Sequence, residues 1–300
     1  MDATFDEEPV WITNDDALSV ISDHKEPIEL PEPPKPKTPR CGEIFRTTRP
    51  ESWAIDTEGT CLFWVKPRLS FQLQQCSSWN TSSTFQAFNI WRPASYFGPT
   101  LTQLGPDPVK LNSEDLIVTS SDDDTETLKS KDTGAIPFTE DNVIAAIDID
   151  RPGIFCCRVC FSYRGQVILA NGERWKFSEI DMDYYHFTRE YDQTNPDGEE
   201  NRPSLVWMLY DSSRPVLTDG VPEDLPFNMD LETRICMVKR SSCLGDPCPD
   251  GGPVLAVMNR NGIVCCDGVE KNTEIATSSI RELVLMTALA VAQYERWLEG

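Results

Sequence analysis

The chain has 300 residues, of which 39% are hydrophobic, and it carries a formal net charge of −22 at pH 7. This length and apolar content allow either one large all-β domain or two smaller domains with real cores. An acidic surface repels phosphates and anionic lipid headgroups, so the charge argues against nucleic-acid binding and against membrane docking through a basic patch.

Residues 1–40 hold ten Asp or Glu against four Lys or Arg, and they end in a run of repeated prolines. Repeated Pro prevents helix formation and strand pairing, and a segment with so few apolar groups cannot offset its ordering entropy. We therefore expect a disordered acidic tail with an extended Pro-rich linker. The first residues lack the basic start and apolar run of a secretory signal peptide, which favours a cytoplasmic or nuclear protein.

From Cys41 the composition changes to short apolar or alternating runs separated by turn residues, which is typical of β-strands. The runs include RLSFQLQQC, TFQAFNIW, VIAAIDI, SLVWMLYD and GIVCC. Hairpin turns are predicted at Arg164-Gly165, at Asn171-Gly172 and at residues 259–262. No long amphipathic helix interrupts the series, so the sequence favours an antiparallel meander over a parallel βαβ sheet.

A second weakly patterned stretch, residues 105–142, contains the run SSDDDTETLKSKDTG. Its composition predicts a long, mobile, acidic insertion between strands. Ser120 and Ser121 directly precede three Asp residues, a pattern that suits an acid-directed kinase, although composition alone favours a solvated loop. The three Asp residues lack the glycine turn of a calcium loop.

Residues 279–298 form the most apolar segment of the chain and carry the signals of a helix. Ser279 and Glu282 have the spacing of an N-terminal capping box. Apolar side chains would lie on every side of this helix between Leu283 and Ala292, with Thr287 as the interruption. An uncharged run of this length is shorter than the roughly 20 residues needed to span a bilayer. We therefore predict a buried core helix, and its simplest container is a closed antiparallel barrel.

These patterns predict a mainly β protein: an antiparallel β-barrel of about 10–12 strands that encloses a hydrophobic C-terminal helix. Such a chain resembles the tubby C-terminal-like superfamily, which includes tubby, plant LURP-one-related proteins and phospholipid scramblases, and in particular a fungal family of uncharacterised domains. The matching segments are AAIDI, VCFSYRGQVILANGERWKF, SLVWMLYDSSRPVL, PVLAVMNRNGIV and RELVLMTALAVAQYERW, within residues 145–298. The resemblance implies one domain over residues 41–300. Tubby binds phosphoinositides through a basic patch, and because this chain lacks such a cluster, that activity is not expected here.

Catalytic signatures are absent from the sequence, which has no G-x-S-x-G, Walker, G-x-G-x-x-G or H-E-x-x-H motif. Its two histidines are His24, in the acidic tail, and His186, so a Ser or Cys nucleophile would depend on His186 as its base. In the run EIDMDYYHF, strand alternation places His186 opposite a solvated face formed by Asp181 and Asp183, which predicts a structural role. A hydrolase centred on His186 and a cysteine is a third function class, in addition to the two described at the end of this section.

Cysteines are the remaining candidates for a site. Cys157 and Cys160 have C-x-x-C spacing but fall on opposite faces of a predicted strand, whereas zinc needs thiolates aimed at one point. Cys243 and Cys248 are separated by four residues on a predicted loop, where they could form a disulfide or redox pair. We expect no metal site and keep these four as weak candidates. Most of the eleven cysteines are expected to be reduced, buried thiols.

The absence of a catalytic constellation predicts a non-enzymatic intracellular binding or scaffolding module without a cofactor. It would act through its loops or its acidic tail on a protein or small-molecule ligand that the sequence does not identify. Nucleic acid and membrane are not expected as partners. The alternative is a membrane-associated, scramblase-like protein whose last helix inserts into lipid.

Overall fold

The computed structural model describes the C-terminal unit of the chain, Thr38–Gly300, over a defined set of segments. These are residues 40–48, 68–79, 84–93, 100–101, 104–105, 108–112, 114–120, 142–150, 162–181, 184–190, 204–210, 221–230, 232–239, 252–272, 275, 277 and 279–299. The predictions made for the acidic tail, for Ser121 and for the acidic run that follows it lie outside the described residues.

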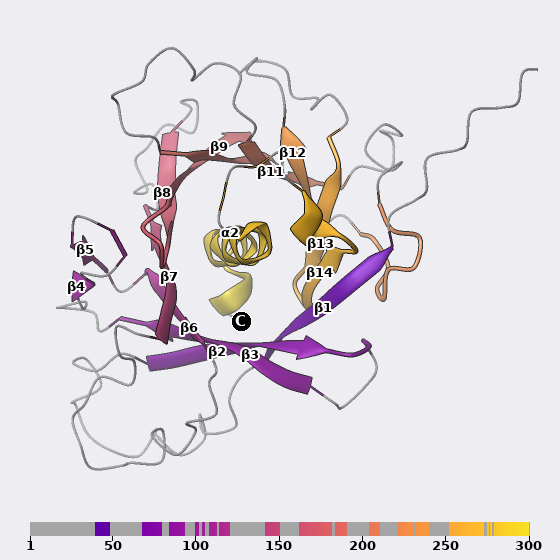
Figure 1. The fold of residues 1–300 in the computed structure, drawn as a ribbon, viewed down its shortest axis with the longest axis horizontal. Helices are drawn as coiled ribbons and strands as arrows, with labels where there is room; N and C mark the ends of the chain where they lie inside the picture. Colours follow the sequence, from indigo (N-terminus) through magenta and orange to yellow (C-terminus); the bar gives the residue numbers. More distant parts are fainter. Residues whose placement is uncertain are drawn as a thin grey trace, which may run out of the picture. The chain divides into compact units, whose positions relative to one another are not determined.

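Twelve strands close into one antiparallel barrel. Figure 1 shows these strands as a ring. They are β1 (Cys41–Thr48), β2 (Arg68–Cys76), β3 (Thr84–Arg92), β6 (Leu116–Ser120), β7 (Val143–Ile149), β8 (Ser162–Leu169), β9 (Arg174–Asp181), β10 (Tyr184–Arg189), β11 (Ser204–Leu209), β12 (Arg234–Lys239), β13 (Val254–Asn259) and β14 (Gly262–Cys266). Neighbours in the barrel follow one another along the chain, and β1 closes the ring by pairing with both β2 and β14. Two short strands, β4 (Thr100–Leu101) and β5 (Val109–Lys110), form a separate sheet.

The helix α2 (Ile280–Tyr294) lies inside the ring of strands (Figure 1). It begins as the sequence predicts, because the Ser279 hydroxyl accepts a hydrogen bond from the Glu282 backbone N–H at 3.3 Å. Short 3-10 turns flank it, η6 (Val269–Lys271) before and η7 (Trp297–Glu299) after. The predicted fold, a mainly β barrel around a hydrophobic C-terminal helix, is confirmed.

Many barrel strands are apolar on both faces, because apolar side chains also pack against the outer face of the barrel. In β11, Leu205 and Trp207 belong to the core around α2. The alternating residues Val206 and Met208 belong to a second core on the outside, against which residues of the segment 221–229 pack. A strand that is buried on both sides has apolar residues at consecutive positions, which explains the sequence SLVWML.

One sequence-based boundary is wrong. The expected insertion over residues 105–142 begins too early, since β5 and the barrel strand β6 lie within that interval. The apolar part of β6 is a short run between acidic and hydroxyl residues, so its pairing with β3 and β7 decides its structure more than its composition does.

The hairpin expected at Arg164-Gly165 is also absent, because both residues lie inside β8. Gly165 has φ 138° at an irregularity in the pairing of β8 with β9. A Cβ atom at this position would lie 2.0 Å from the Asp148 carbonyl oxygen. The glycine is therefore required by the close approach of β7, rather than by a chain reversal. The turns at Asn171-Gly172 and at residues 259–262 are present, between β8 and β9 and between β13 and β14.

No helix in the described part of the chain is long and apolar enough to cross a bilayer.

Candidate functional site

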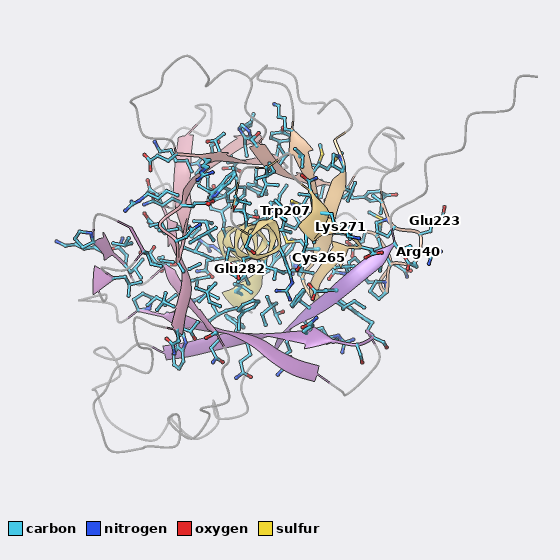
Figure 2. The ribbon with its side chains drawn as sticks, viewed as in Figure 1. Arg40, Trp207, Glu223, Cys265, Lys271 and Glu282 are labelled. Carbon is cyan, nitrogen blue, oxygen red and sulfur yellow. The ribbon has the colours of Figure 1, made fainter. Side chains whose placement is uncertain are left out.

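The interior of the barrel is filled by the protein's own side chains (Figure 2). The residues of α2 from Leu283 to Val291 are fully buried, and so are wall residues such as Phe45, Leu73 and Trp207. All except Thr287 belong to one hydrophobic cluster that joins helix and strands. The interior is therefore a packed structural core, and α2 occupies the position that a ligand holds in barrels that carry one inside.

A polar contact joins β11 to α2 within this core. The Trp207 indole N–H donates a hydrogen bond to the Thr287 hydroxyl at 3.0 Å, and that hydroxyl donates in turn to the Val284 carbonyl of its own helix at 3.0 Å. A buried N–H without a partner is costly, so the single hydroxyl in the apolar stretch of α2 has a structural explanation. It also fixes the rotation of α2 against β11.

A group of six side chains surrounds the last turn of α2, and we call it the C-terminal cluster: Arg164, Glu179, Tyr185, Arg234, Tyr294 and Glu295. The Arg234 Nη2 atom donates to Glu295 Oε1 at 2.7 Å, and the Tyr185 hydroxyl donates to the same oxygen. The Arg164 Nε atom and the Tyr294 hydroxyl donate to Glu179 Oε2 at 3.1 and 2.6 Å. Each carboxylate thus binds one arginine and one tyrosine.

The electrostatics of the C-terminal cluster keep both tyrosines as hydrogen-bond donors. Burial raises the pKa of Tyr185 far above its usual value, and the hydrogen bond to Glu295 raises that pKa further. Burial and the contact with Glu179 raise the pKa of Tyr294 in the same way. Because both carboxylates are engaged by cations and hydroxyls, the cluster ties the end of α2 to the strands and does not present a free base.

His186 lies on the outer wall, on β10, and is buried with 8% of its surface exposed. Its Nε2 atom is 2.6 Å from the Ser204 hydroxyl on β11. Burial lowers the pKa of His186 to about 4, and the nearby Lys239 charge lowers it as well, so the imidazole is neutral at pH 7. A neutral imidazole beside a hydroxyl has the form of a base and nucleophile, but Ser204 is itself buried, and the two groups satisfy each other's hydrogen bonds.

The solvated face predicted near His186 treats the run EIDMDYYHF as one strand, which is wrong. Asp181 ends β9, and Tyr184 begins β10, which pairs with β9 in the antiparallel sense. Alternation cannot be followed across a change of strand, so Asp181 gives no information about the face that His186 occupies.

The remaining sequence candidates are not brought together. His24, Cys157, Cys160, Cys243 and Cys248 all lie outside the described residues, and Ser120 is the last residue of β6. In the described part of the chain, no three or more His, Cys, Asp or Glu side chains are grouped as a metal site. Five cysteines are described, and all are free thiols: Cys41, Cys76, Cys236, Cys265 and Cys266.

Sequence reasoning missed the C-terminal cluster, because its members come from five separate segments of the chain. The available signal was weak: charged residues stand at both ends of the otherwise apolar run RICMVK, which begins with Arg234. Comparison of the chain with protein-family models, with curated proteins and with solved structures found no match.

Proposed function

We propose that this chain is a non-enzymatic binding or scaffolding module of tubby-like architecture that works in the cytoplasm or nucleus. The observation that carries the proposal is the filled barrel: α2 occupies the interior, and the polar groups of the C-terminal cluster bind one another. A closed barrel of this kind is a rigid support, and recognition then falls to its loops and to residues 1–40.

The charge of the chain gives the chemistry of the partner. A net charge of −22 attracts a surface rich in Lys and Arg and repels phosphate groups. We therefore propose a protein partner with a basic face, which the acidic residues of 1–40 and of the loops would contact.

In-cell crosslinking followed by capture tests this function, with the full chain compared to a chain that lacks residues 1–40. We expect a reproducible protein partner whose binding, once it is purified, weakens steeply between 50 and 300 mM salt and falls when residues 1–40 are removed. Binding that weakens neither at high salt nor on removal of residues 1–40 would contradict an electrostatic role for the acidic residues. Labelling by serine- or cysteine-directed activity probes that disappears in His186→Ala would instead indicate an enzyme.

The alternative, a scramblase-like protein with α2 inserted in lipid, requires the helix to leave the barrel. The burial of α2 against the strand wall weighs against it, because withdrawal would expose the apolar linings of both. Flotation of the full chain with vesicles of phosphatidylcholine, and with vesicles that also contain phosphatidylserine and phosphatidylinositol bisphosphate, separates the two functions. We expect the protein to remain with the unbound fraction; co-flotation, or resistance to carbonate extraction from cell membranes, would support the membrane function.

A further inference from the structure

Two cysteines face each other across the seam where the barrel closes. Cys41 is the first residue of β1 and Cys266 the last of β14, and the two are direct partners in the antiparallel pairing of these strands. The seam joins the first barrel strand of the chain to the last one. A covalent bond at this point would therefore close the barrel into a loop that includes all its strands.

The backbone pattern shows which kind of pair they form. The Asp267 N–H donates to the Arg40 carbonyl at 2.8 Å, so residues 40 and 267 are a hydrogen-bonded pair. Cys41 and Cys266, one position further along, are consequently a non-hydrogen-bonded pair, whose Cα atoms lie about 4.5 Å apart with side chains on the same face. Disulfides form at Cα separations of about 4.4–6.8 Å, so the backbone needs no large movement.

Access to the pair is one-sided. Cys41 is partly exposed, whereas Cys266 is 4% exposed, packed in the outer core. The Cys41 thiol donates to the Asp224 carbonyl at 3.3 Å, and the Cys41 N–H donates to the Asp224 side chain at 3.0 Å. An oxidant would therefore reach Cys41 first, and rotation of its side chain away from Asp224 would bring the sulfur to Cys266.

We propose that Cys41 and Cys266 are a reversible oxidation site that a low-molecular-weight disulfide, such as oxidised glutathione, converts to a cross-strand disulfide. The Cys41 thiolate attacks one glutathione sulfur and releases one reduced glutathione. The Cys266 thiolate then attacks the Cys41 sulfur of the mixed disulfide and releases the second. The two thiols lose two electrons and two protons, which reduce one oxidised glutathione to two reduced molecules.

The electrostatics of the pair set its speed. Burial raises the pKa of both thiols to about 12, and Asp224 adds to the effect. Only thiolates react, so exchange is slow at neutral pH, and its rate rises about tenfold per pH unit between pH 7 and 9. The pair thus stays reduced in a reducing compartment and records sustained oxidation.

The other described cysteines lack this arrangement. Cys236 and Cys265 lie on β12 and β14, separated by Ala256 on the intervening strand β13. Cys76 on β2 lies opposite Ile44 rather than another cysteine. Cys76 is also buried on the outer wall, which makes it a matched control for substitution.

Peptide mapping tests the proposal on the full chain. The protein is incubated with oxidised glutathione at pH 7 and pH 9, free thiols are alkylated, and trypsin is added. Cleavage after Arg40, Arg46, Arg260 and Lys271 isolates residues 41–46 and 261–271. We expect these two peptides to be linked, to separate on reduction, and to form faster at pH 9. The link should persist in Cys265→Ala, because that neighbour lies on the inner face.

Thermal melting provides the second measurement. The oxidised protein should melt about 5–15 °C above the reduced protein, since the bond restricts the unfolded chain over a very long loop. This difference should vanish in Cys41→Ser, at a partly exposed position that tolerates the change, and persist in Cys76→Ser. The proposal is overturned if the folded protein gives no linked 41–46 and 261–271 peptides at pH 9, or if Cys41→Ser keeps the full difference.

Discussion

At the scale of single residues, the structure depends on a few polar atoms placed inside an apolar interior. Thr287 is the clearest example, because it accepts the Trp207 N–H in the middle of the core. Thr287→Val keeps the shape of the side chain and removes the acceptor, which leaves a buried donor without a partner. We expect a loss of about 1–3 kcal/mol in the free energy of unfolding.

Urea unfolding followed by tryptophan fluorescence measures this loss. Trp207→Phe and the double variant complete a cycle in which the effect of Thr287→Val should shrink once the indole is gone. An effect of Thr287→Val that is the same in both backgrounds would show that the hydrogen bond is not its cause.

His186 predicts a specific dependence of stability on pH. Its pKa is lowered to about 4 in the folded protein, against 6.5 for an unperturbed histidine. Between these two pH values, the imidazole binds a proton in the unfolded chain and not in the folded chain. The contribution of His186 to the free energy of unfolding is therefore complete above pH 6.5 and is lost as the pH falls toward 4. The full shift corresponds to about 3 kcal/mol.

Two measurements check the His186 contribution. In His24→Gln the remaining imidazole can be titrated by NMR without overlap, and its midpoint should lie near pH 4. The difference in unfolding free energy between the wild type and His186→Gln should also change between pH 6.5 and 4. The comparison with His186→Gln is needed because a second group titrates in the same range. Burial raises the pKa of Asp115 to about 7, so protonation of Asp115 stabilises the folded state as the pH falls. A midpoint near 6.5 would contradict the burial argument.

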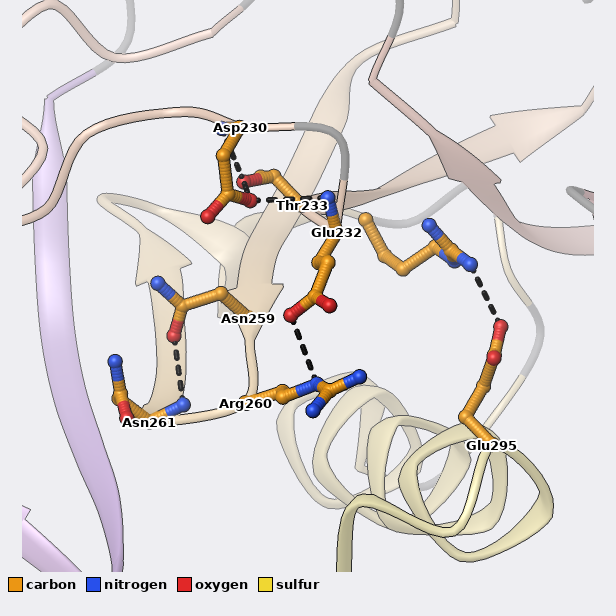
Figure 3. A network of polar contacts seen from close by, with 8 residues as sticks. Asp230, Glu232, Thr233, Asn259, Arg260, Asn261 and Glu295 are labelled. Carbon is orange, nitrogen blue, oxygen red and sulfur yellow. Dashed lines mark hydrogen bonds and ion pairs between the residues drawn. The ribbon is translucent and has the colours of Figure 1, made fainter.

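At the scale of elements, the two ends of α2 are fixed by different means. Its start is capped by Ser279 and held by an ion pair between Arg281 on α2 and Glu43 on β1. Its end is held by Glu295, which binds the guanidinium of Arg234. Figure 3 labels Glu295 and marks its ion pair with a dashed line. In the described part of the chain, the Nε and Nη1 atoms of Arg234 have no hydrogen-bond partner, so Glu295 is its main source of compensation.

Removing the charge of Glu295 should therefore be expensive. The Arg234 and Glu295 side chains are 7% and 21% exposed, and Glu295→Gln leaves a buried cation without its anion, with an expected loss of about 3 kcal/mol. The same change in Glu232 is a matched control, because its ion pair with Arg260, also drawn in Figure 3, has side chains 48% and 60% exposed. Glu232→Gln should cost about 0.5 kcal/mol or less. Equal losses in chemical denaturation would refute the distinction.

The sequence predicts elements well where the local pattern is strong, and poorly where pairing with neighbouring strands decides whether a segment forms a strand. The apolar run and the capping signal of α2 are local, and together with the series of strands they predicted the enclosed helix. β6 was missed because its short apolar run gains its strand character from β3 and β7. The turn predicted at Gly165 is absent, because the sequence does not distinguish a glycine that lies close to a neighbouring strand from one that reverses the chain.

At the scale of the whole described unit, closure of the barrel brings together residues that no sequence pattern connects. Register between β1 and β14 places Cys41 against Cys266, and register among β8 to β12 assembles the C-terminal cluster. Register depends on every intervening pairing and bulge, so these contacts could not be predicted from the chain alone. The fold class was therefore accessible from the sequence, whereas the polar contacts of the candidate site were not.

The dependence of the barrel on its own last segment gives the final prediction. A chain that ends at residue 278 lacks α2, whose buried side chains belong to one hydrophobic cluster with residues from every strand of the barrel. Those inner faces would line an open apolar space, and a wall of this kind collapses or associates with other copies. We expect the truncated chain to bind an apolar dye such as ANS, to lose near-ultraviolet circular dichroism and to melt without a cooperative transition. A peptide of residues 275–299 added during refolding should restore part of the transition, which distinguishes a missing core from damage to the strands. A truncated chain that melts cooperatively near the wild-type temperature would show that the strands close without the helix.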